Sequence, residues 1–308
     1  MMRTSFSISR VAKRMRKNAV LYLLLLLPIA YIIIFKYVPM YGAQIAFRDY
    51  RITRGIWESP WVGLKYFEKF LNNRMFERVM VNTLRINFYS LLTFPCSIIF
   101  AFMLHYLPFK RFRKTLQIVS YAPHFISTVV MCGLILNYFS TFGMFNQLRS
   151  LLGLESVNYL SNAQAFPALF VWTGVWQGVG YGSILYISAL SGVDYELHEA
   201  AIMDGATILK RVWHIDLPGI LPMVMVMLVL RCGSLLSVGY EKVYLLQNDL
   251  NLKTSEVIST YVWKQGISAT LPQYSYSTAV GLFTSVINLF MLVLVNGVSK
   301  RMTSHSIW

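Results

Sequence analysis

The sequence predicts an all-α membrane protein with six transmembrane helices, on the grounds of its composition and its apolar runs. Hydrophobic residues make up 56% of the 308 residues and charged residues only 13%, whereas soluble domains carry about 25% charged residues. Runs of roughly 20 apolar residues, the length that crosses a bilayer core, recur along the chain. The predicted spans are residues 19–35, 86–107, 118–139, 165–190, 217–236 and 276–298.

The first apolar run is predicted to be a retained membrane anchor. A signal peptide also places an apolar run after a basic head, but this run is longer and no small-x-small cleavage site follows it before Lys36. The fourth and fifth runs are less uniform, because Gly, Gln and Trp interrupt the fourth and Arg231 lies in the fifth. The predicted divisions are a basic tail (1–18), a first helix (19–36), an external loop (37–78), a five-helix transmembrane domain (79–299) and a second tail (300–308).

Basic residues without neighbouring acids flank the predicted spans at three places. Six spans put all three places on the same side of the membrane, and the positive-inside rule makes that side cytoplasmic. The external loop also contains basic residues, but long loops weigh less in the rule. We therefore expect a multi-pass protein of the bacterial plasma (inner) membrane with both termini in the cytoplasm. The three groups are Arg3, Arg10, Lys13, Arg14, Arg16 and Lys17; Lys110, Arg111, Arg113 and Lys114; and Lys300 and Arg301.

Several other classes of protein are disfavoured. The net charge of +15 comes from residues that flank spans, where they meet anionic lipid head groups, so a nucleic-acid partner is not expected. The three cysteines lie singly in predicted spans, which argues against a disulfide framework or a metal site. His198 and Glu199 begin a zinc-protease H-E-x-x-H, but Ile202 stands at the second ligand position. The sequence contains no G-x-x-x-x-G-K-[ST] phosphate loop, so we expect neither an enzyme nor a cofactor bound by this chain.

The most informative segment is the loop between the fourth and fifth predicted spans, residues 191–218. Ser191 or Asp194 can cap a first short helix, because either side chain can accept a hydrogen bond from a free backbone N–H. Residues 195–204 are mostly good helix formers. Gly205 suits the left-handed position that ends a helix. The pattern predicts a short helix followed by a tight corner.

A second short helix is predicted after that corner. Thr207 can cap it, and apolar residues recur at helical spacing over residues 208–215. Pro218 then fits the first turn of the next span, where its missing N–H costs nothing. The small residues of the loop would let another surface approach closely; they are Ala200, Ala201, Gly205 and Ala206.

The spacing in this loop resembles a known motif. The fixed residues are Glu199, Ala200, Ala201, Gly205, Ile215, Leu217 and Pro218. They meet every fixed position of E-A-A-x3-G-x9-I-x-L-P, the EAA loop of the permeases of bacterial binding-protein-dependent importers. The resemblance implies the type I ABC importer permease fold, in which this loop forms the coupling helix that docks on the ATP-hydrolysing subunit. Carried over, Glu199 and Asp204 would be polar contacts to that subunit. Ala200 and Ala201 would be the close-packed face and Gly205 the turn.

A further resemblance concerns the cargo. Residues 39–71, residues 239–267 and the terminal Ser-Ile-Trp are similar to the complex-carbohydrate branch of that family. The implied function is a non-catalytic permease subunit that forms half of the pathway for an oligosaccharide delivered by an external solute-binding protein. A second homologous permease and two ATP-binding subunits, which would bind ATP and Mg, are the implied partners.

Two other interpretations stay open. An ABC permease for another solute, such as an amino acid or a peptide, would share the EAA spacing. A secondary transporter should show internal repeats or mid-span carboxylates. We see no repeat, and none of the 13 acidic residues lies within a predicted span.

Candidate pathway residues lie in the fourth and fifth predicted spans. Trp172, Trp176, Tyr181 and Tyr186 recur on roughly one helix face, and aromatic faces suit the C–H patches of sugar rings; core or lipid-facing packing is the alternative. Gln177 is a polar residue that could bind hydroxyl groups or a neighbouring helix. Arg231 lies deep in a span, where a charge usually faces a cavity or a partner unless it snorkels to the head groups.

Overall fold

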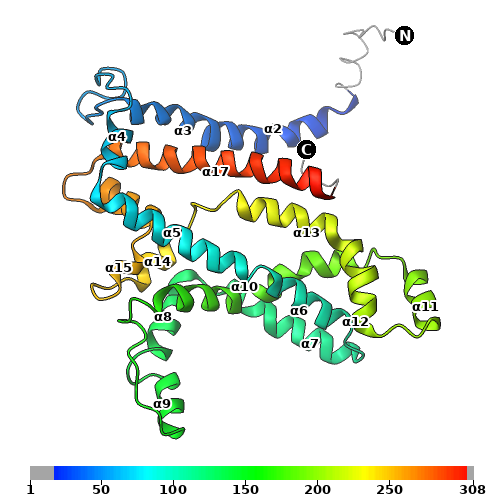
Figure 1. Ribbon diagram of the computed structural model, residues 1–308. Helices are drawn as coiled ribbons and strands as arrows, with labels where there is room; N and C mark the ends of the chain where they lie inside the picture. The colour runs from blue at the N-terminus through cyan, green and yellow to red at the C-terminus, as the bar shows by residue number, and fades with distance from the viewer. Residues whose placement is uncertain (1–16, 304–308) are drawn as a thin grey trace.

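The computed structural model describes residues 17–303, and the chain is helical along most of that length (Figure 1). Within those residues, extended pairing is limited to two isolated bridges, Arg48 with Trp61 and Arg51 with Gly55. The predicted all-α class is therefore confirmed. Residues 1–16, with five of the six basic residues of the first tail, and the terminal Ser-Ile-Trp lie outside the described residues.

The helices follow one another along the chain with the labels of Figure 1. The amino-terminal half contains α2 (Ala19–Ile32), η1 (Ile33–Tyr37), α3 (Val38–Met40), η2 (Tyr41–Phe47), α4 (Lys65–Leu71), α5 (Arg74–Leu92), α6 (Pro95–His105), α7 (Lys110–Tyr121), η3 (Ala122–Phe125), α8 (Thr128–Tyr138) and α9 (Met144–Leu151). The remainder contains α10 (Phe166–Leu190), α11 (Tyr195–Met203), α12 (Ile208–Arg211), η4 (Val212–Asp216), α13 (Leu217–Cys232), α14 (Tyr240–Leu246), α15 (Leu252–Ser255), α16 (Ile258–Trp263), η5 (Lys264–Ser268) and α17 (Tyr274–Thr303).

Four helical stretches of the described chain are long and apolar enough to cross a membrane. A fifth candidate is the pair formed by α7 with η3 and by α8, which meet at a bend of 100°. α10 has 25 residues and no charge, but Gly, Gln, Trp and Tyr lower its hydropathy, and it is not among these candidates. The count of six spans is therefore not confirmed. The four stretches are Ala19–Phe47, Arg74–His105, Ile208–Cys232 and Tyr274–Arg301.

The third predicted span, residues 118–139, is not one continuous helix. Pro123 lies in η3 and has no N–H to continue the helical ladder. Ser127 has an extended backbone, and its hydroxyl oxygen accepts a hydrogen bond of 3.3 Å from the N–H of Val130, so it caps α8. Hydropathy does not register a cap inside an apolar run, and the prediction of one spanning helix over residues 118–139 was wrong for that reason.

The first span lies at the edge of the helix assembly. Helical structure continues from α2 through η1 and α3 to Phe47, well beyond residue 35, where the predicted span ends. No residue of α2 is buried within the chain. η2 and α4 pack on α17, so the carboxyl-terminal end of this helical segment is attached to the rest of the chain. α2 itself has an apolar surface on all sides. Such a helix is suited to lipid or to another membrane subunit.

α10 is the central helix of the assembly, since it packs on α5, α6, α7 and α13. Tyr186 and Leu190 of α10 are buried with Ile98 of α6 and Ile220 of α13. Small residues permit the close approach that such packing needs. A Cβ atom on Gly180 would overlap the backbone carbonyl of Ser120 in α7.

We expect Gly180→Ala to destabilise the chain by about 1–3 kcal/mol, because the clash is with backbone that cannot rotate away. The matched control is Gly281→Ala in α17, where nothing lies within 4 Å of the added Cβ. The control should be neutral or slightly stabilising, because Ala is the better helix former. Thermal unfolding of the detergent-solubilised variants measures both effects, and equal midpoints would contradict the packing assignment.

The two ends of the assembly differ in what they contain. Figure 1 shows the start of α2, the end of α17, the turn between α6 and α7, and α11 at one end, toward the right of the view. The segment around α4 and the helices α14 and α15 lie toward the opposite end. The basic residues at the start of α7 therefore share an end with the loop that contains α11.

Candidate functional site

The loop 191–218 folds into the predicted first helix and corner. Of the two predicted caps, Asp194 is the one that forms, with its Oδ1 accepting from the N–H of Glu196 at 3.0 Å. α11 then runs to Met203, and Gly205 adopts φ of +71°, the left-handed conformation expected of it. The N–H of Ala206 closes the corner on the carbonyl of Ala201 at 2.8 Å.

The second helix of the loop begins as predicted but does not end before the next span. The Thr207 hydroxyl oxygen accepts from the N–H of Lys210 at 3.5 Å and caps α12. α12, η4 and α13 then form one helical stretch, Ile208–Cys232. η4 is a wide π-turn in which the N–H of Leu217 bonds to the carbonyl of Val212, and it lies directly before Pro218. The prediction of a separate helix over residues 208–215 was therefore wrong. The wide π-turn lets the helix continue through Pro218 into α13.

The outer surface of the loop is open and largely apolar. Glu199, Ala200 and Asp204 are exposed, whereas Ala201 is half-buried, so only one of the two alanines presents an open face. Ile215 and Leu217 are half-buried and Pro218 is exposed. Contiguous exposed apolar groups indicate a contact surface. Large apolar side chains exposed on α11, α12 and η4 are Tyr195, Leu197, Ile202, Met203, Ile208, Leu209 and Trp213.

The inner surface of the loop is held by a polar cluster, which we call the Asp216 cluster. Its members are the buried Asp216 and His198 and the half-buried Tyr106 and Arg211. The Tyr106 hydroxyl donates to Asp216 Oδ2 at 2.5 Å. His198 Nε2 lies 3.1 Å from Asp216 Oδ1, and the Arg211 guanidinium lies 5.4 Å from the centre of the Tyr106 ring. Asp216 is fully buried and His198 nearly so. The cluster joins α11 to η4 and to the end of α6.

The Asp216 cluster escaped the sequence analysis. Asp216 occupies the variable position between Ile215 and Leu217 of the EAA pattern. It lies inside the helical stretch Ile208–Cys232, and Glu77 lies inside Arg74–His105, so two acidic residues do lie within candidate spans. The signal that could have found it is a carboxylate at the entrance to an apolar helix, since a buried charge requires partners. Burial first, and then the hydrogen bond from Tyr106 to the carboxylate, raise the pKa of the Tyr106 hydroxyl, which keeps it a donor.

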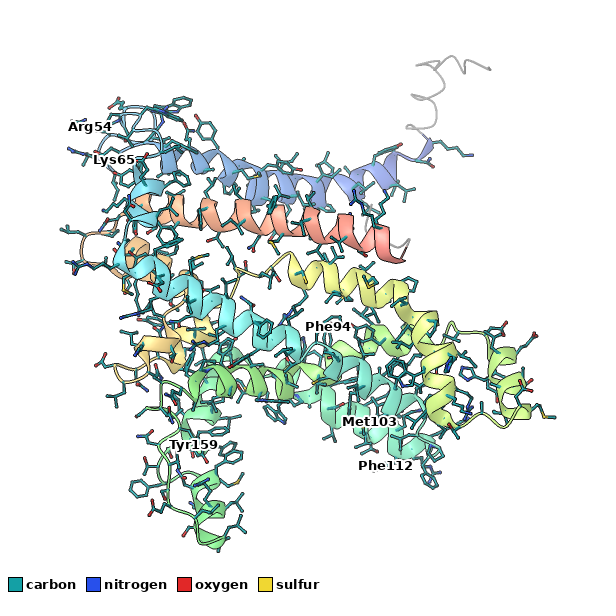
Figure 2. The ribbon with its side chains drawn as sticks, viewed as in Figure 1. Arg54, Lys65, Phe94, Met103, Phe112 and Tyr159 are labelled. Carbon is teal, nitrogen blue, oxygen red and sulfur yellow. The ribbon has the colours of Figure 1, made fainter. Side chains whose placement is uncertain are left out.

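A cavity of about 590 Å³ brings together two of the predicted pathway residues, Gln177 and Arg231. Its wall comes from the break between α5 and α6, from α10, and from α13 and α14. Phe94, labelled in Figure 2, lies at that break and forms part of the wall. The Gln177 amide donates to the carbonyl of Ile126 at 3.1 Å, so this residue also anchors the bend before α8.

The four predicted aromatic residues of α10 do not line one cavity. Trp172 and Trp176 line a different cavity of about 610 Å³, which is almost wholly apolar and lies between α8, α9 and α10. Tyr181 stacks on His124, with ring centres 3.8 Å apart and planes parallel to within 2°. Tyr186 is buried and lines the first cavity. At 100° per residue, Trp172, Trp176 and Tyr186 fall within about 80° around the helix, whereas Tyr181 lies on the opposite side. Tyr186 lies more than two turns farther along the helix than Trp176, so it reaches a different cavity.

Comparison with known proteins places this architecture among transport permeases. The family model described as binding-protein-dependent transport system inner membrane component matches residues 94–304. Protein LplB of Bacillus subtilis (strain 168) is 40% identical over 296 residues, which cover 96% of this chain and 92% of LplB. The polygalacturonan/rhamnogalacturonan transport system permease protein YteP of the same organism is 37% identical, with 97% and 93% of the two chains covered.

Two solved structures also resemble the chain over nearly its whole length. A bacterial ABC transporter involved in the import of the acidic polysaccharide alginate superposes with a TM-score of 0.87 at 34% identity, over 96% of this chain and 99% of that one. A second structure, of a bacterial alginate ABC transporter in complex with alginate pentasaccharide-bound periplasmic protein, gives the same score and identity over 97% and 100% of the two chains.

Proposed function

This chain belongs to the family of binding-protein-dependent transport system inner membrane components, and from that premise we propose that it forms half of the pathway of an ATP-driven oligosaccharide importer. The loop 191–218 is the observation that carries the proposal. It meets the full EAA spacing, its corner has the required left-handed glycine, and its outer surface presents exposed apolar groups beside Glu199. A surface of this kind is suited to dock a partner that supplies the energy.

The oligosaccharide cargo is supported by the relatives. YteP is named for polygalacturonan and rhamnogalacturonan transport, and the structurally similar transporter imports alginate. Both are similar to this chain over nearly its whole length, loop 37–78 included. An amino acid or peptide cargo has no such support, and a secondary transporter offers no account of the EAA spacing.

The proposed assembly contains a second homologous permease, two ATP-binding subunits and an extracytoplasmic solute-binding protein. The alginate transporter in complex with its periplasmic protein supports the last of these. ATP and Mg would be bound by the partner subunits, and this chain would be a non-catalytic member. The apolar, unburied α2 offers one surface for lipid or for the second permease.

The end of the assembly that contains α11 is proposed to face the cytoplasm. Lys110, Arg111, Arg113 and Lys114 at the start of α7 lie at that end, in agreement with the positive-inside rule. The start of α2 and the end of α17 lie at the same end, which supports the proposal that both termini are cytoplasmic. The segment 41–73 and the helices α14 and α15 would then face the solute-binding protein.

Affinity purification of the tagged chain from its own host's membranes tests the assembly. We expect mass spectrometry to identify an ATPase and a second permease of the same family in stoichiometric amounts. Deletion of residues 195–203, which removes α11, should lose the ATPase but keep the second permease. Recovery of the chain alone, still competent for uptake, would contradict the importer and favour a secondary transporter.

A further inference from the structure

Two positively charged side chains line the 590 Å³ cavity, and neither forms an ion pair with an acidic residue in the described part of the chain. Arg231 comes from the last turn of α13 and Lys242 from α14, so separate elements bring them to the same wall. Among the described residues that line this cavity there is no Asp or Glu. The rest of the polar lining consists of hydroxyl and amide groups; these are Ser90, Thr93, Ser97, Gln177 and Ser234.

Arg231 is fixed in position but not neutralised. Its guanidinium donates to the hydroxyl of Ser90 on α5, which aims the group across the break between α5 and α6. A hydroxyl supplies one acceptor for a group with five N–H donors, and the side chain stays exposed. The remaining donors can therefore receive a planar anion, for which the guanidinium has the matching geometry.

Lys242 is held more deeply. Its Nζ donates to the carbonyl of Phe170 at 3.0 Å and lies 4.7 Å from the centre of the Phe170 ring. Burial lowers the pKa of Lys242 to about 8. The carbonyl and the ring offset only part of the desolvation of the ammonium group, so a bound anion would stabilise its charged form.

Another lysine of the chain, Lys264, forms a structural ion pair and serves as a comparison. Lys264 lies 2.6 Å from the buried carboxylate of Glu256. Within the described residues, neither Arg231 nor Lys242 belongs to an ion pair of this kind. The chain therefore neutralises one semi-buried lysine internally and leaves another, facing the cavity, to be neutralised by something else.

We propose that this cavity receives the carboxylate of a uronic acid unit, so that the cargo of the importer is an anionic oligosaccharide. The inference rests on the proposed function and names its substrate class. Arg231 and Lys242 bind the carboxylate, while the hydroxyl and amide groups of the wall take up sugar hydroxyls. Phe94, Phe170 and Tyr186 border the same space and offer aromatic surface to the C–H face of the sugar ring.

The test compares an acid with its own ester. Host cells carrying the chain, or a deletion as the baseline, are given labelled tetra- to hexasaccharides of galacturonate, glucuronate or mannuronate, each beside its methyl ester and beside a neutral oligosaccharide. We expect at least one acid to be taken up about tenfold faster than its ester, the value of one hydrogen bond to a charged group. Arg231→Gln and Lys242→Gln should each reduce that ratio several-fold, and the double variant should bring it close to one.

Arg85→Gln is the matched control, because Arg85 is an exposed arginine of α5, the helix that also provides Ser90, and does not line the cavity. It should leave the ratio unchanged. A ratio of two probes in the same cells is independent of how much of each variant is inserted. Equal uptake of acids and esters, uptake of neutral sugars alone, or a ratio untouched by the double variant would overturn the inference and leave the importer intact. Uptake of no oligosaccharide above the deletion baseline would instead contradict the proposed function.

Discussion

Gly205→Trp is expected to abolish uptake while the chain still inserts in the membrane and assembles with its second permease. A Cβ atom at Gly205 meets nothing within 4 Å, so the chain itself has room for a large side chain. The backbone φ of +71° adds a strain of roughly 1–2 kcal/mol, which a domain tolerates. The loss is expected because the indole would stand on the surface where we propose that the ATP-hydrolysing partner docks. Uptake and co-purification of the ATPase measure the effect.

Gly153→Trp is the control for strain alone. Gly153 lies in the turn after α9, has φ of +70° and also has nothing within 4 Å of its added Cβ. It should reproduce the cost in stability and retain the ATPase. Glu199→Lys, which reverses the charge of an exposed residue on α11, should also abolish uptake. Normal transport by both loop variants would mean that the loop does not couple the permease to its energy source.

Asp216→Ala is expected to destabilise the chain by about 3 kcal/mol and to uncouple ATP hydrolysis from transport. The substitution leaves the half-buried Tyr106 hydroxyl without its acceptor and removes the carboxylate that lies 3.1 Å from the buried His198 ring. Removing one member of a buried polar pair is far more costly than losing an exposed one. α11 would also lose its attachment to η4 and α6. The unfolding midpoint and the ATPase rate of the purified assembly report the two effects separately.

Asp204→Ala is the control for stability, because Asp204 is an exposed aspartate of the same loop. Its effect on the midpoint should stay within about 0.5 kcal/mol. A cycle that combines Asp216→Ala with Tyr106→Phe should show a coupling energy above about 0.5 kcal/mol, since the two residues are in direct contact. Additive effects would mean that the contact between α6 and η4 contributes nothing of its own.

The sequence predicted local structure correctly at positions where only neighbouring residues determine it. Asp194, Gly205 and Thr207 form their caps and corner because each needs only neighbouring backbone. The bend before α8 was not readable from hydropathy, because Pro123 and Ser127 act on the hydrogen-bond ladder without changing the apolar character of the run.

The candidate sites contain contacts that the sequence did not predict, because they join residues far apart along the chain. The contact between Tyr106 and Asp216 joins residues 110 positions apart, and the cavity joins Arg231 to Lys242 through a change of chain direction. Pairs of this kind depend on tertiary packing, which no periodicity in a single sequence reports. Arg231 was a candidate because a charge in a span is conspicuous. Lys242 was not, because it follows the span and has no such signal.

The continuous helix Ile208–Cys232 has a mechanical consequence. At 1.5 Å per residue its 25 residues extend about 37 Å, from the cap at Thr207 to the cation at Arg231. A displacement of one end of this helix is therefore transmitted to the other end. The helix can bend at the π-turn η4 and at Pro222, where the regular hydrogen-bond ladder is interrupted. The coupling free energy between two binding sites is reciprocal. If a bound sugar in the cavity changes the affinity of the loop for its partner by some factor, the bound partner should change the affinity of the cavity for the sugar by the same factor.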